Sequence, residues 1–346
     1  MEKGKTTIAG FDIGGAHLKV TRAENGRIVQ AVSIATPLWQ GLDHLDAGLR
    51  EAAPIYAGTD INAFTMTGEL SDVFASREAG VAGLLERIAT HFPGGEKLVY
   101  AGRSSFVRMN EAAGLANDIA SANWHATASL VAKLAGEALF VDMGSTTTDL
   151  IPVRGGAVAG HGYTDAERLL SAELVYTGFT RTFLFGVASS APVRGRLTPL
   201  MNEYFASMAD AHRILGVLDE KDDKHASADG QAKTVAGSTA RIARMVGHDA
   251  ADLEPEEWRT VARWFSEQQL RLVHDAAFRT AGNLAADAPI VGAGTGRRQL
   301  RRLAERMERR FIDFADLIPV DDAVRGEASS AAPASAVALL AGMQQA

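Results

Sequence analysis

The fold is decided by the stretch Ile8-Ala9-Gly10-Phe11-Asp12-Ile13-Gly14-Gly15-Ala16-His17-Leu18-Lys19-Val20 near the start of the chain. An apolar strand leads to a carboxylate at Asp12, turns on two glycines, and continues into a second strand. Glycine lets the backbone turn tightly and bring its N–H groups close to an anion. The aspartate ahead of the turn can hold a cation, or water bound to that cation, against the same anion. The stretch therefore predicts a phosphate-binding turn.

A near copy of this pattern lies much further along the chain, at Ala138-Leu139-Phe140-Val141-Asp142-Met143-Gly144-Ser145-Thr146-Thr147-Thr148-Asp149-Leu150. Strands expected at 149–153 and 157–160 then repeat the strand-turn-strand plan of the first copy. A repeat at such a separation indicates two similar domains with a cleft between them, not a solenoid. We expect the two turns to face each other and to clamp a di- or triphosphate.

Composition limits the classes of partner. A chain of 346 residues is too long for one small core, and its net charge of -7 gives no global basic field for nucleic acid or anionic lipid. The absence of cysteine excludes disulfides, thiolate chemistry and sulfur-ligated metals. No signal-peptide core or apolar run of membrane-spanning length is present. We therefore expect a cytoplasmic, soluble enzyme without nucleic-acid or membrane partners, and we leave open a homo-oligomer.

Hydrophobic patterning supplies the elements of the first half. Strands are predicted at 6–12, 17–23 and 27–34, the last two joined by the hairpin signal Asn25-Gly26. Residues 110–134 suggest one long alanine-rich helix with a candidate break near Ser121. Its polar residues Asn123, Trp124 and His125 either line a cleft or pack on the next domain, and the pattern does not separate these alternatives.

Later segments add further candidate ligand contacts. Helices are expected from Thr164 or Asp165 to 175, and over 201–215. The charged stretch 219–233 is either a solvated loop or a lid over a charged substrate. A buried strand then opens into Gly292-Ala293-Gly294-Thr295-Gly296, followed by a basic helix over 297–310, and a helix N-terminus after glycines suits an anion or nucleotide. A small-residue helix over 328–346 is expected to lie where the domains hinge.

In this order, the two acid-led turns, the middle helix, the Gly292–Gly296 turn and the last helix resemble a known superfamily. They are similar to the phosphate loops, connecting helices and adenosine loop of actin, sugar kinases and heat-shock chaperones. The resemblance implies an α/β fold with two ribonuclease-H-like domains of the actin and hexokinase type, each with a mixed five-stranded sheet, and an interdomain cleft. The implied division is 1–137 plus 330–346 for one domain, and 138–329, with a helical insertion, for the other.

Within that superfamily, the triple-threonine loop resembles the hydantoinase and oxoprolinase branch. His161-Gly162-Tyr163-Thr164-Asp165-Ala166-Glu167-Arg168, with Glu173 to Gly178 and Arg181, is similar to short hydantoinase-like proteins of the tetrahydromethanopterin-linked one-carbon pathway. This resemblance implies a step of methanofuran biosynthesis. An aminomethylfuran-methyl diphosphate is joined to the phenol oxygen of γ-glutamyltyramine or a tyrosine-type analogue, and diphosphate is released. These two small molecules would be the partners, and no ATP enters the reaction.

The reaction of that family implies that the leaving diphosphate needs a metal and hydrogen-bond donors. Asp12 and Asp142 are expected to hold Mg²⁺ directly or through water, with Asp149 as a third candidate ligand. The expected diphosphate donors are Gly14, Gly15, Gly144, Ser145, Thr146 and Thr147, with Lys19 as a candidate to neutralise a phosphate. Gly292 and Gly294 are further candidates for substrate binding.

The acceptor needs a base and an anchor. Glu173, Asp165 and His161 are candidate bases for the phenol proton. Arg168 or Arg181 would suit the acceptor's carboxylate, because a guanidinium binds it at two points.

Two other hypotheses use the same loops. In the first, the protein is an ATP-dependent enzyme, either a small-molecule kinase or a lactam-opening enzyme. In the second, it is a nucleotide-sensing or filament-forming protein of the actin type. Arg297 and Arg298 follow the third glycine turn where sugar kinases usually place a catalytic acid. Ser145 replaces the glycine usual in the hydantoinase loop and narrows the room near the phosphates. Both departures argue against ATP as a cofactor and favour the synthase.

Overall fold

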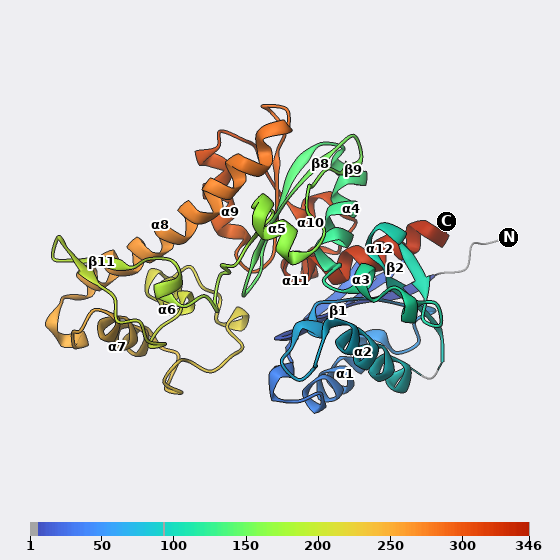
Figure 1. The fold of residues 1–346 in the computed structure, drawn as a ribbon, viewed down its shortest axis with the longest axis horizontal. Coiled ribbons are helices and arrows are strands. Elements are labelled where there is room, and N and C mark those ends of the chain that lie inside the picture. Colours follow the sequence, from blue (N-terminus) through green and yellow to red (C-terminus); the bar gives the residue numbers. More distant parts are fainter. Residues whose placement is uncertain (1–5, 93, 346) are drawn as a thin grey trace. The chain divides into compact units, whose positions relative to one another are not determined.

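The computed structural model describes residues 6–92 and 94–345 (Figure 1). These residues form two compact units. One contains the described chain through Phe140, Ile151–Gly160, and the chain from Ile312 onward; the other contains Val141–Leu150 and His161–Phe311. From the sequence, we expected domain boundaries at 138 and 330. In the structure, the chain passes from one unit to the other within strands and at residue 312.

The first sheet has the strand order β3-β2-β1-β4-β5-β6. The order comprises β1 (Thr7–Ile13), β2 (His17–Glu24), β3 (Arg27–Ala35), β4 (Ile61–Met66), β5 (Glu96–Tyr100) and β6 (Phe106–Arg108). β1 pairs antiparallel with β2 and parallel with β4, so the sheet is mixed as predicted. The predicted hairpin is confirmed, since Asn25 and Gly26 have φ values of 52° and 74°.

The second sheet has the order β10-β8-β7-β13-β14, with β9 beside β8. Its strands are β7 (Ala138–Met143), β8 (Thr148–Arg154), β9 (Ala157–Val158), β10 (Leu174–Val175), β13 (Ile290–Ala293) and β14 (Phe311–Asp313). The predicted α/β class with two mixed sheets is confirmed. The expected count of five strands is wrong, because each sheet has six within the described residues. The short edge strands β6 and β9 are too brief to leave a clear period-two pattern.

Helices of the first unit are α1 (Asp43–Tyr56), α2 (Arg77–His91), α3 (Ala116–Ile119), α4 (Asn123–Ala135), α10 (Phe314–Leu317), α11 (Arg325–Ser330) and α12 (Ala332–Gln345). The core of this unit includes stacked Phe11 and Phe64, whose ring centroids lie 4.6 Å apart. The single helix expected over 110–134 is wrong, but the break is confirmed at Ser121, where φ is 54°. The helix expected over 328–346 likewise divides into α11 and α12.

The second unit carries α5 (Asp165–Ser171), α6 (Met208–Leu215), α7 (Val235–Met245), α8 (Pro255–Thr280), α9 (Arg297–Arg306) and the hairpin β11 (Ser190–Val193) and β12 (Arg196–Pro199). Trp258 and Phe265 of α8 pack in a second core with α6 and α7. Three helices are shorter than expected: α5 ends before 175, α6 begins after 201, and α9 ends before 310. α5 ends early because Ala172 has a left-handed backbone with φ of 64°.

Close packing of α12 on β1 requires a glycine in the strand. A Cβ atom built on Gly10 would lie 2.1 Å from the Ala334 carbonyl oxygen and 2.9 Å from the Ala338 Cβ. These separations are too short for any carbon contact, so the strand and the helix would have to move apart. The small residues predicted for the last helix therefore permit close contact with the first sheet.

We expect Gly10→Ala to lower the free energy of unfolding by about 3 kcal/mol, because the added methyl overpacks a backbone contact. Gly114→Ala is the matched control, since a Cβ there meets nothing within 4 Å. Urea unfolding of both variants measures the difference. Equal stability of the two variants would contradict this account of the β1–α12 contact.

Candidate active site

The two acid-led turns share one backbone geometry. The Gly14 N–H donates to the His17 carbonyl at 2.9 Å, and the Gly144 N–H donates to the Thr147 carbonyl at 2.9 Å. In both, the aspartate is the penultimate residue of its strand, and Asp12 and Asp142 are 2% and 8% exposed. The internal repeat seen in the sequence is thus a structural repeat, with a buried carboxylate beside each turn.

Asp12 lies among polar groups of the first unit. The Lys19 Nζ lies 3.3 Å from its Oδ2, because the antiparallel register of β1 and β2 places the two residues opposite each other. The Asn123 amide donates to the Asp12 Oδ1 at 3.4 Å. Lys19 therefore offsets the charge of Asp12, and α4 contributes Asn123 to this turn.

The neighbours of Asn123 on α4 have other environments. Trp124 is buried, and the His125 Nδ1 lies 2.9 Å from the Tyr100 hydroxyl. Burial, helped by the charge of Arg103, lowers the pKa of His125 to about 4, so this ring is neutral at pH 7. On this helix, Asn123 thus forms a hydrogen bond with a turn carboxylate.

The third glycine turn packs directly against Asp142. Gly294 has φ of +85°, and a Cβ on it would lie 2.3 Å from both the Asp142 Oδ1 and the Met143 carbonyl oxygen. The Gly296 N–H donates to that carbonyl at 2.9 Å. A Cβ on Gly292 would meet the Phe311 ring at 2.4 Å. Of the two glycines predicted as substrate contacts, Gly294 thus packs against the Asp142 turn, whereas Gly292 packs against the Phe311 ring.

Residues 177–181 support the Gly144–Thr147 turn from another side. A Cβ on Gly178 would lie 2.4 Å from the Thr146 nitrogen, so the two backbones touch. The Arg181 N–H donates to the Ser145 carbonyl at 2.9 Å, and its guanidinium donates to the Thr146 hydroxyl at 3.1 Å. Buried Gln269 of α8 donates to the Gly178 carbonyl at 2.7 Å. Sequence analysis missed Gln269, which lies in an otherwise regular amphipathic helix.

Two predicted site residues pair with each other. The Arg168 Nη2 donates to the Asp149 Oδ1 at 2.8 Å and lies 3.8 Å from the Asp165 Oδ1. Arg168 is 3% exposed, and a buried guanidinium is stable only beside an anion. This pairing favours a structural role for Asp149 and Arg168 over metal and acceptor binding.

Glu173 fixes the loop that precedes α5. Its carboxylate is 1% exposed and accepts the N–H groups of His161 at 2.6 Å and Gly162 at 2.8 Å. The predicted N-cap at Thr164 is confirmed as a capping box with Glu167. Among the candidate bases, Asp165 is half-buried at the start of α5 and His161 is exposed, so both are more accessible than Glu173.

Comparison with known proteins places this arrangement in a family. Residues 60–310 match the hydantoinase/oxoprolinase family. The chain belongs to that family. It is 30% identical over 337 residues to a (4-{4-[2-(gamma-L-glutamylamino)ethyl]phenoxymethyl}furan-2-yl)methanamine synthase from Methanocaldococcus jannaschii, covering 97% of this chain and 98% of the relative. A synthase with the same name from Methanococcus vannielii is 34% identical over 124 residues, which cover 36% of this chain and 55% of that relative.

Solved structures with similar chains include a ROK family glucokinase from Streptomyces griseus in complex with glucose and AMPPNP. The sequence identity is 13% and the TM-score is 0.46, with 97% of this chain and 98% of the glucokinase covered. Within the described residues, no helix is long and apolar enough to cross a membrane.

In this hydantoinase/oxoprolinase family member, the charged stretch 219–233 is attached to α6 by a buried cation. Arg213 is 5% exposed and donates to both carboxylate oxygens of Glu220 at 2.8 Å, and to the Asp223 Oδ2 at 2.6 Å. The Lys233 ammonium donates to the His225 carbonyl at 2.8 Å. These contacts hold the stretch in place, and its two alternative roles, a solvated loop or a lid over a substrate, stay predictions.

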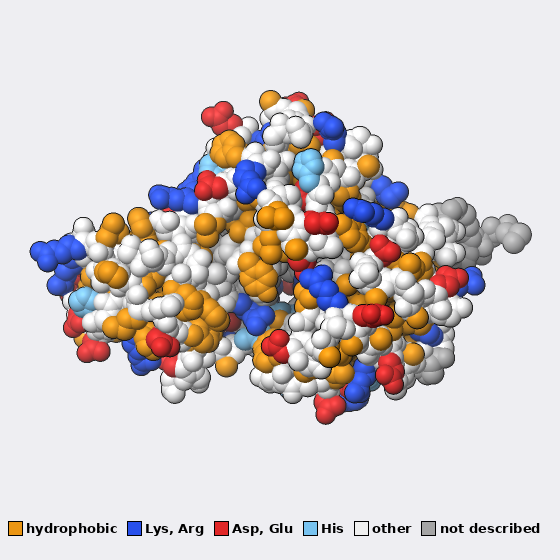
Figure 2. Space-filling view, in the orientation of Figure 1, with side chains coloured by type: hydrophobic (Ala, Val, Ile, Leu, Met, Phe, Trp, Pro, Cys, Tyr) orange, Lys and Arg blue, Asp and Glu red, His pale blue; other side chains and the backbone are white. Residues whose placement is uncertain are grey.

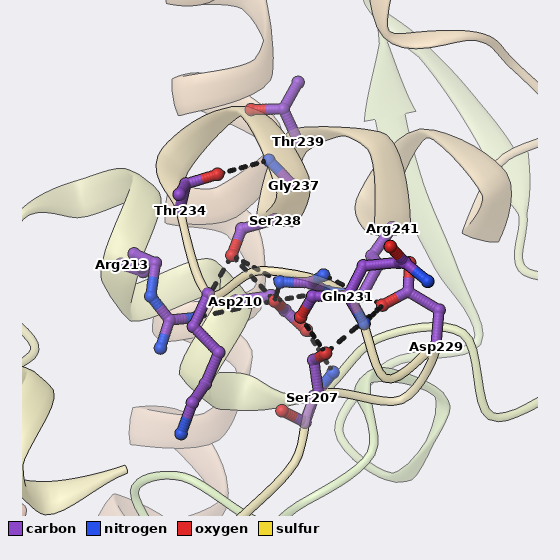
Figure 3. A network of polar contacts seen from close by, with 12 residues as sticks. Ser207, Asp210, Arg213, Asp229, Gln231, Thr234, Gly237, Ser238, Thr239 and Arg241 are labelled. Carbon is purple, nitrogen blue, oxygen red and sulfur yellow. Dashed lines mark hydrogen bonds and ion pairs between the residues drawn. The ribbon is translucent and has the colours of Figure 1, made fainter.

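A second buried arginine fixes the other end of this stretch (Figure 3). Arg241 of α7 donates to the Asp210 Oδ1 at 2.8 Å and to the Asp229 Oδ1 at 3.0 Å. The Ser238 hydroxyl donates to the same Asp210 oxygen at 2.7 Å and accepts from Arg213 at 3.1 Å, so it joins the two arginines. The stretch 219–233 is therefore one structural unit with α6 and α7.

We expect Arg213→Met to lower the free energy of unfolding by about 2–3 kcal/mol, because it removes the charge-assisted hydrogen bonds to Asp223, whose side chain is 11% exposed, and to Glu220, whose side chain is 56% exposed. Lys221→Met is the matched control: its ion pair with Asp219 joins side chains that are 60% and 42% exposed, and such pairs contribute at most about 1 kcal/mol. Denaturant unfolding measures both, and limited proteolysis should show faster cleavage within 219–233 in Arg213→Met. Unchanged stability and cleavage would show that Arg213 does not fix the stretch.

Proposed function

We propose that this protein joins the methylene carbon of an aminomethylfuran-methyl diphosphate to the phenol oxygen of γ-glutamyltyramine or a tyrosine-type analogue. The observation that carries this proposal is similarity over almost the full length of both chains to a synthase whose name describes that phenoxymethyl-furan product. The acid-led glycine turns support it, because they offer backbone N–H groups and carboxylates of the kind that bind a diphosphate and its cation.

The proposed reaction exchanges one carbon–oxygen bond for another. The bond between the methylene carbon and the diphosphate oxygen breaks, and its electron pair leaves with diphosphate. The phenol oxygen forms the new ether bond, and its proton passes to a base. The furan ring shares the positive charge that develops on the methylene carbon, so no protein nucleophile is required. A chain without cysteine is compatible with this chemistry.

The leaving group needs donors held in advance of the reaction. In the second unit, Gly144, Ser145, Thr146 and Thr147 offer backbone N–H groups and hydroxyls, and the backing by residues 177–181 holds this turn in one conformation. In the first unit, Gly14 and Gly15 offer the same kind of turn, and Gly15 has open space around its Cα. We assign both turns to phosphate oxygens.

Mg²⁺ is the cation that we assign to the acid-led turns. Within the described residues, no group of three or more histidine, aspartate or glutamate side chains is arranged to hold a metal. Mg²⁺ does not need such a cage, because it keeps several waters and binds through one or two carboxylates together with substrate phosphates. Asp142 is the carboxylate of the second unit that we assign to a cation, and Asp12 is the corresponding carboxylate of the first unit. The bound ion would neutralise charge on the leaving diphosphate.

Of the three candidate bases for the phenol proton, we propose Asp165. Both oxygens of Glu173 accept backbone N–H groups, so its carboxylate is committed to the loop. Asp165 is more accessible than Glu173, and its Oδ1 lies 3.8 Å from the Arg168 guanidinium.

We expect Asp142→Asn to reduce diphosphate release at least about 100-fold, because the neutral amide would hold Mg²⁺ less well than the carboxylate, and the bound ion would neutralise charge on the leaving diphosphate. Diphosphate released from the furan substrate and γ-glutamyltyramine is measured by a coupled assay. Asp287→Asn is the matched control, an exposed aspartate in the same unit. Full activity of a folded Asp142→Asn variant would contradict the assignment of this carboxylate.

Removal of divalent cations should abolish turnover and leave the protein folded, because the carboxylates sit in turns that the surrounding backbone holds without a metal. Activity is measured after treatment with a chelator, and circular dichroism monitors the fold. Adding Mg²⁺ back should restore the rate. Undiminished diphosphate release in the chelator would overturn the metal proposal.

A further inference from the structure

Exposed aromatic side chains gather in the second unit beside the supported phosphate turn. Phe183 and Tyr204 are 41% and 45% exposed, and their ring centroids lie 4.3 Å apart at an interplanar angle of 42°. Phe185 lies next to Phe183, with centroids 5.4 Å apart. Figure 2 shows hydrophobic side chains gathered on the visible face over α6, the helix that follows Tyr204. An exposed aromatic pair of this kind gains stability when an apolar group covers it.

Backbone contacts fix this pair in position. Phe183 and Ser207 form an isolated antiparallel bridge, and the Met208 N–H donates to the Thr182 carbonyl at 2.8 Å. The Leu184 N–H donates to the Ala206 carbonyl at 3.3 Å. The two segments that carry the rings are thus joined to each other. The rings form a preformed surface, which lowers the entropy cost of binding a ligand.

A cation connects this surface to the phosphate turn. Arg181 lies two residues before Phe183, and its guanidinium donates to the Thr146 hydroxyl at 3.1 Å. Partial burial lowers the pKa of Arg181, and the nearby Tyr176 and Tyr204 hydroxyls act in the opposite direction. An arginine in this setting stays charged at neutral pH. The surface therefore has an apolar aromatic part and an adjacent positive charge.

The attached stretch 219–233 adds a neutral group near the same cation. Burial, followed by the charges of Arg181 and Lys233, lowers the pKa of His225 to about 4. His225 is consequently uncharged at pH 7, and Lys233 lies 3.6 Å from the Asp223 carboxylate, so Arg181 is the cation that we consider for a ligand here. A ligand matched to the region has an aryl ring and an anionic tail.

We propose that Phe183 and Tyr204 bind the aryl ring of the acceptor, and that Arg181 binds the carboxylate at the other end of the same molecule. This proposal rests on the proposed function and names the acceptor subsite within it. It places the acceptor beside the Thr146 end of the phosphate turn. Two-point recognition of ring and carboxylate would select γ-glutamyltyramine over an aryl compound without an anion.

The test measures steady-state kinetics with each substrate varied in turn. We expect Phe183→Ala and Tyr204→Ala each to raise the KM for γ-glutamyltyramine about five- to tenfold, because each removes one ring contact, while the KM for the furan diphosphate changes less than about twofold. Tyr204→Phe should recover most of what Tyr204→Ala loses. Leu197→Ala on the β11–β12 hairpin is the control, because it also truncates an exposed hydrophobic side chain in this unit.

Arg181→Gln tests the carboxylate contact. Saturation-transfer NMR measures direct binding of γ-glutamyltyramine and of uncharged N-acetyltyramine. We expect the unaltered protein to prefer the former about tenfold, and the variant to lose that preference. Binding is measured without turnover, so this experiment separates the proposed subsite from the proposed function. If the unaltered protein binds the acceptor but releases no diphosphate, the proposed function is overturned and the subsite is not. The subsite is overturned if the acceptor KM and acceptor binding are unchanged in all three variants. It is also overturned if the unaltered protein is a dimer and truncation of Phe183 or Tyr204 makes it a monomer, because a second copy of the chain would then cover the rings.

Discussion

Close approach of backbone to backbone around Asp142 is the constraint on which the second unit depends. Gly294 and Gly178 lie against opposite parts of the turn that follows β7, each at a distance that no side chain would allow. The turn closes with the same Gly N–H to carbonyl bond that closes the Asp12 turn in the first unit. Such packing leaves the carboxylate and the N–H groups few conformations, and preorganised donors are what stabilisation of a leaving anion requires.

Charged residues around this turn serve mainly to hold the scaffold. Arg168 is paired with Asp149, Glu173 accepts two backbone N–H groups, and buried Arg213 and Arg241 attach the stretch 219–233 to α6 and α7. Each of these groups would be costly if left without its partner. The chain thus uses these ion pairs within its scaffold, whereas Arg181 donates to the Thr146 hydroxyl of the turn itself.

Sequence reasoning predicted what depends on local chemistry. The two acid-led turns, the Asn25-Gly26 hairpin, the cap at Thr164 and the break near Ser121 each follow from residue types over a few positions, and each is present. It did not predict that Asp149 and Arg168 pair, that Glu173 serves a loop, or that Gln269 holds residues 177–178, because these partners are brought together only by the fold. The sequence also did not predict the short edge strands or the exact ends of helices, because tertiary contacts decide where these elements begin and end.

In the proposed function, the Asp142 turn binds the diphosphate together with a divalent cation. Calorimetric titration of inorganic diphosphate into the protein, with and without Mg²⁺, measures this binding. We expect binding that is at least about tenfold tighter with Mg²⁺ and that is lost in Asp142→Asn. Diphosphate binding that is indifferent to Mg²⁺, or that survives this substitution unchanged, would contradict it.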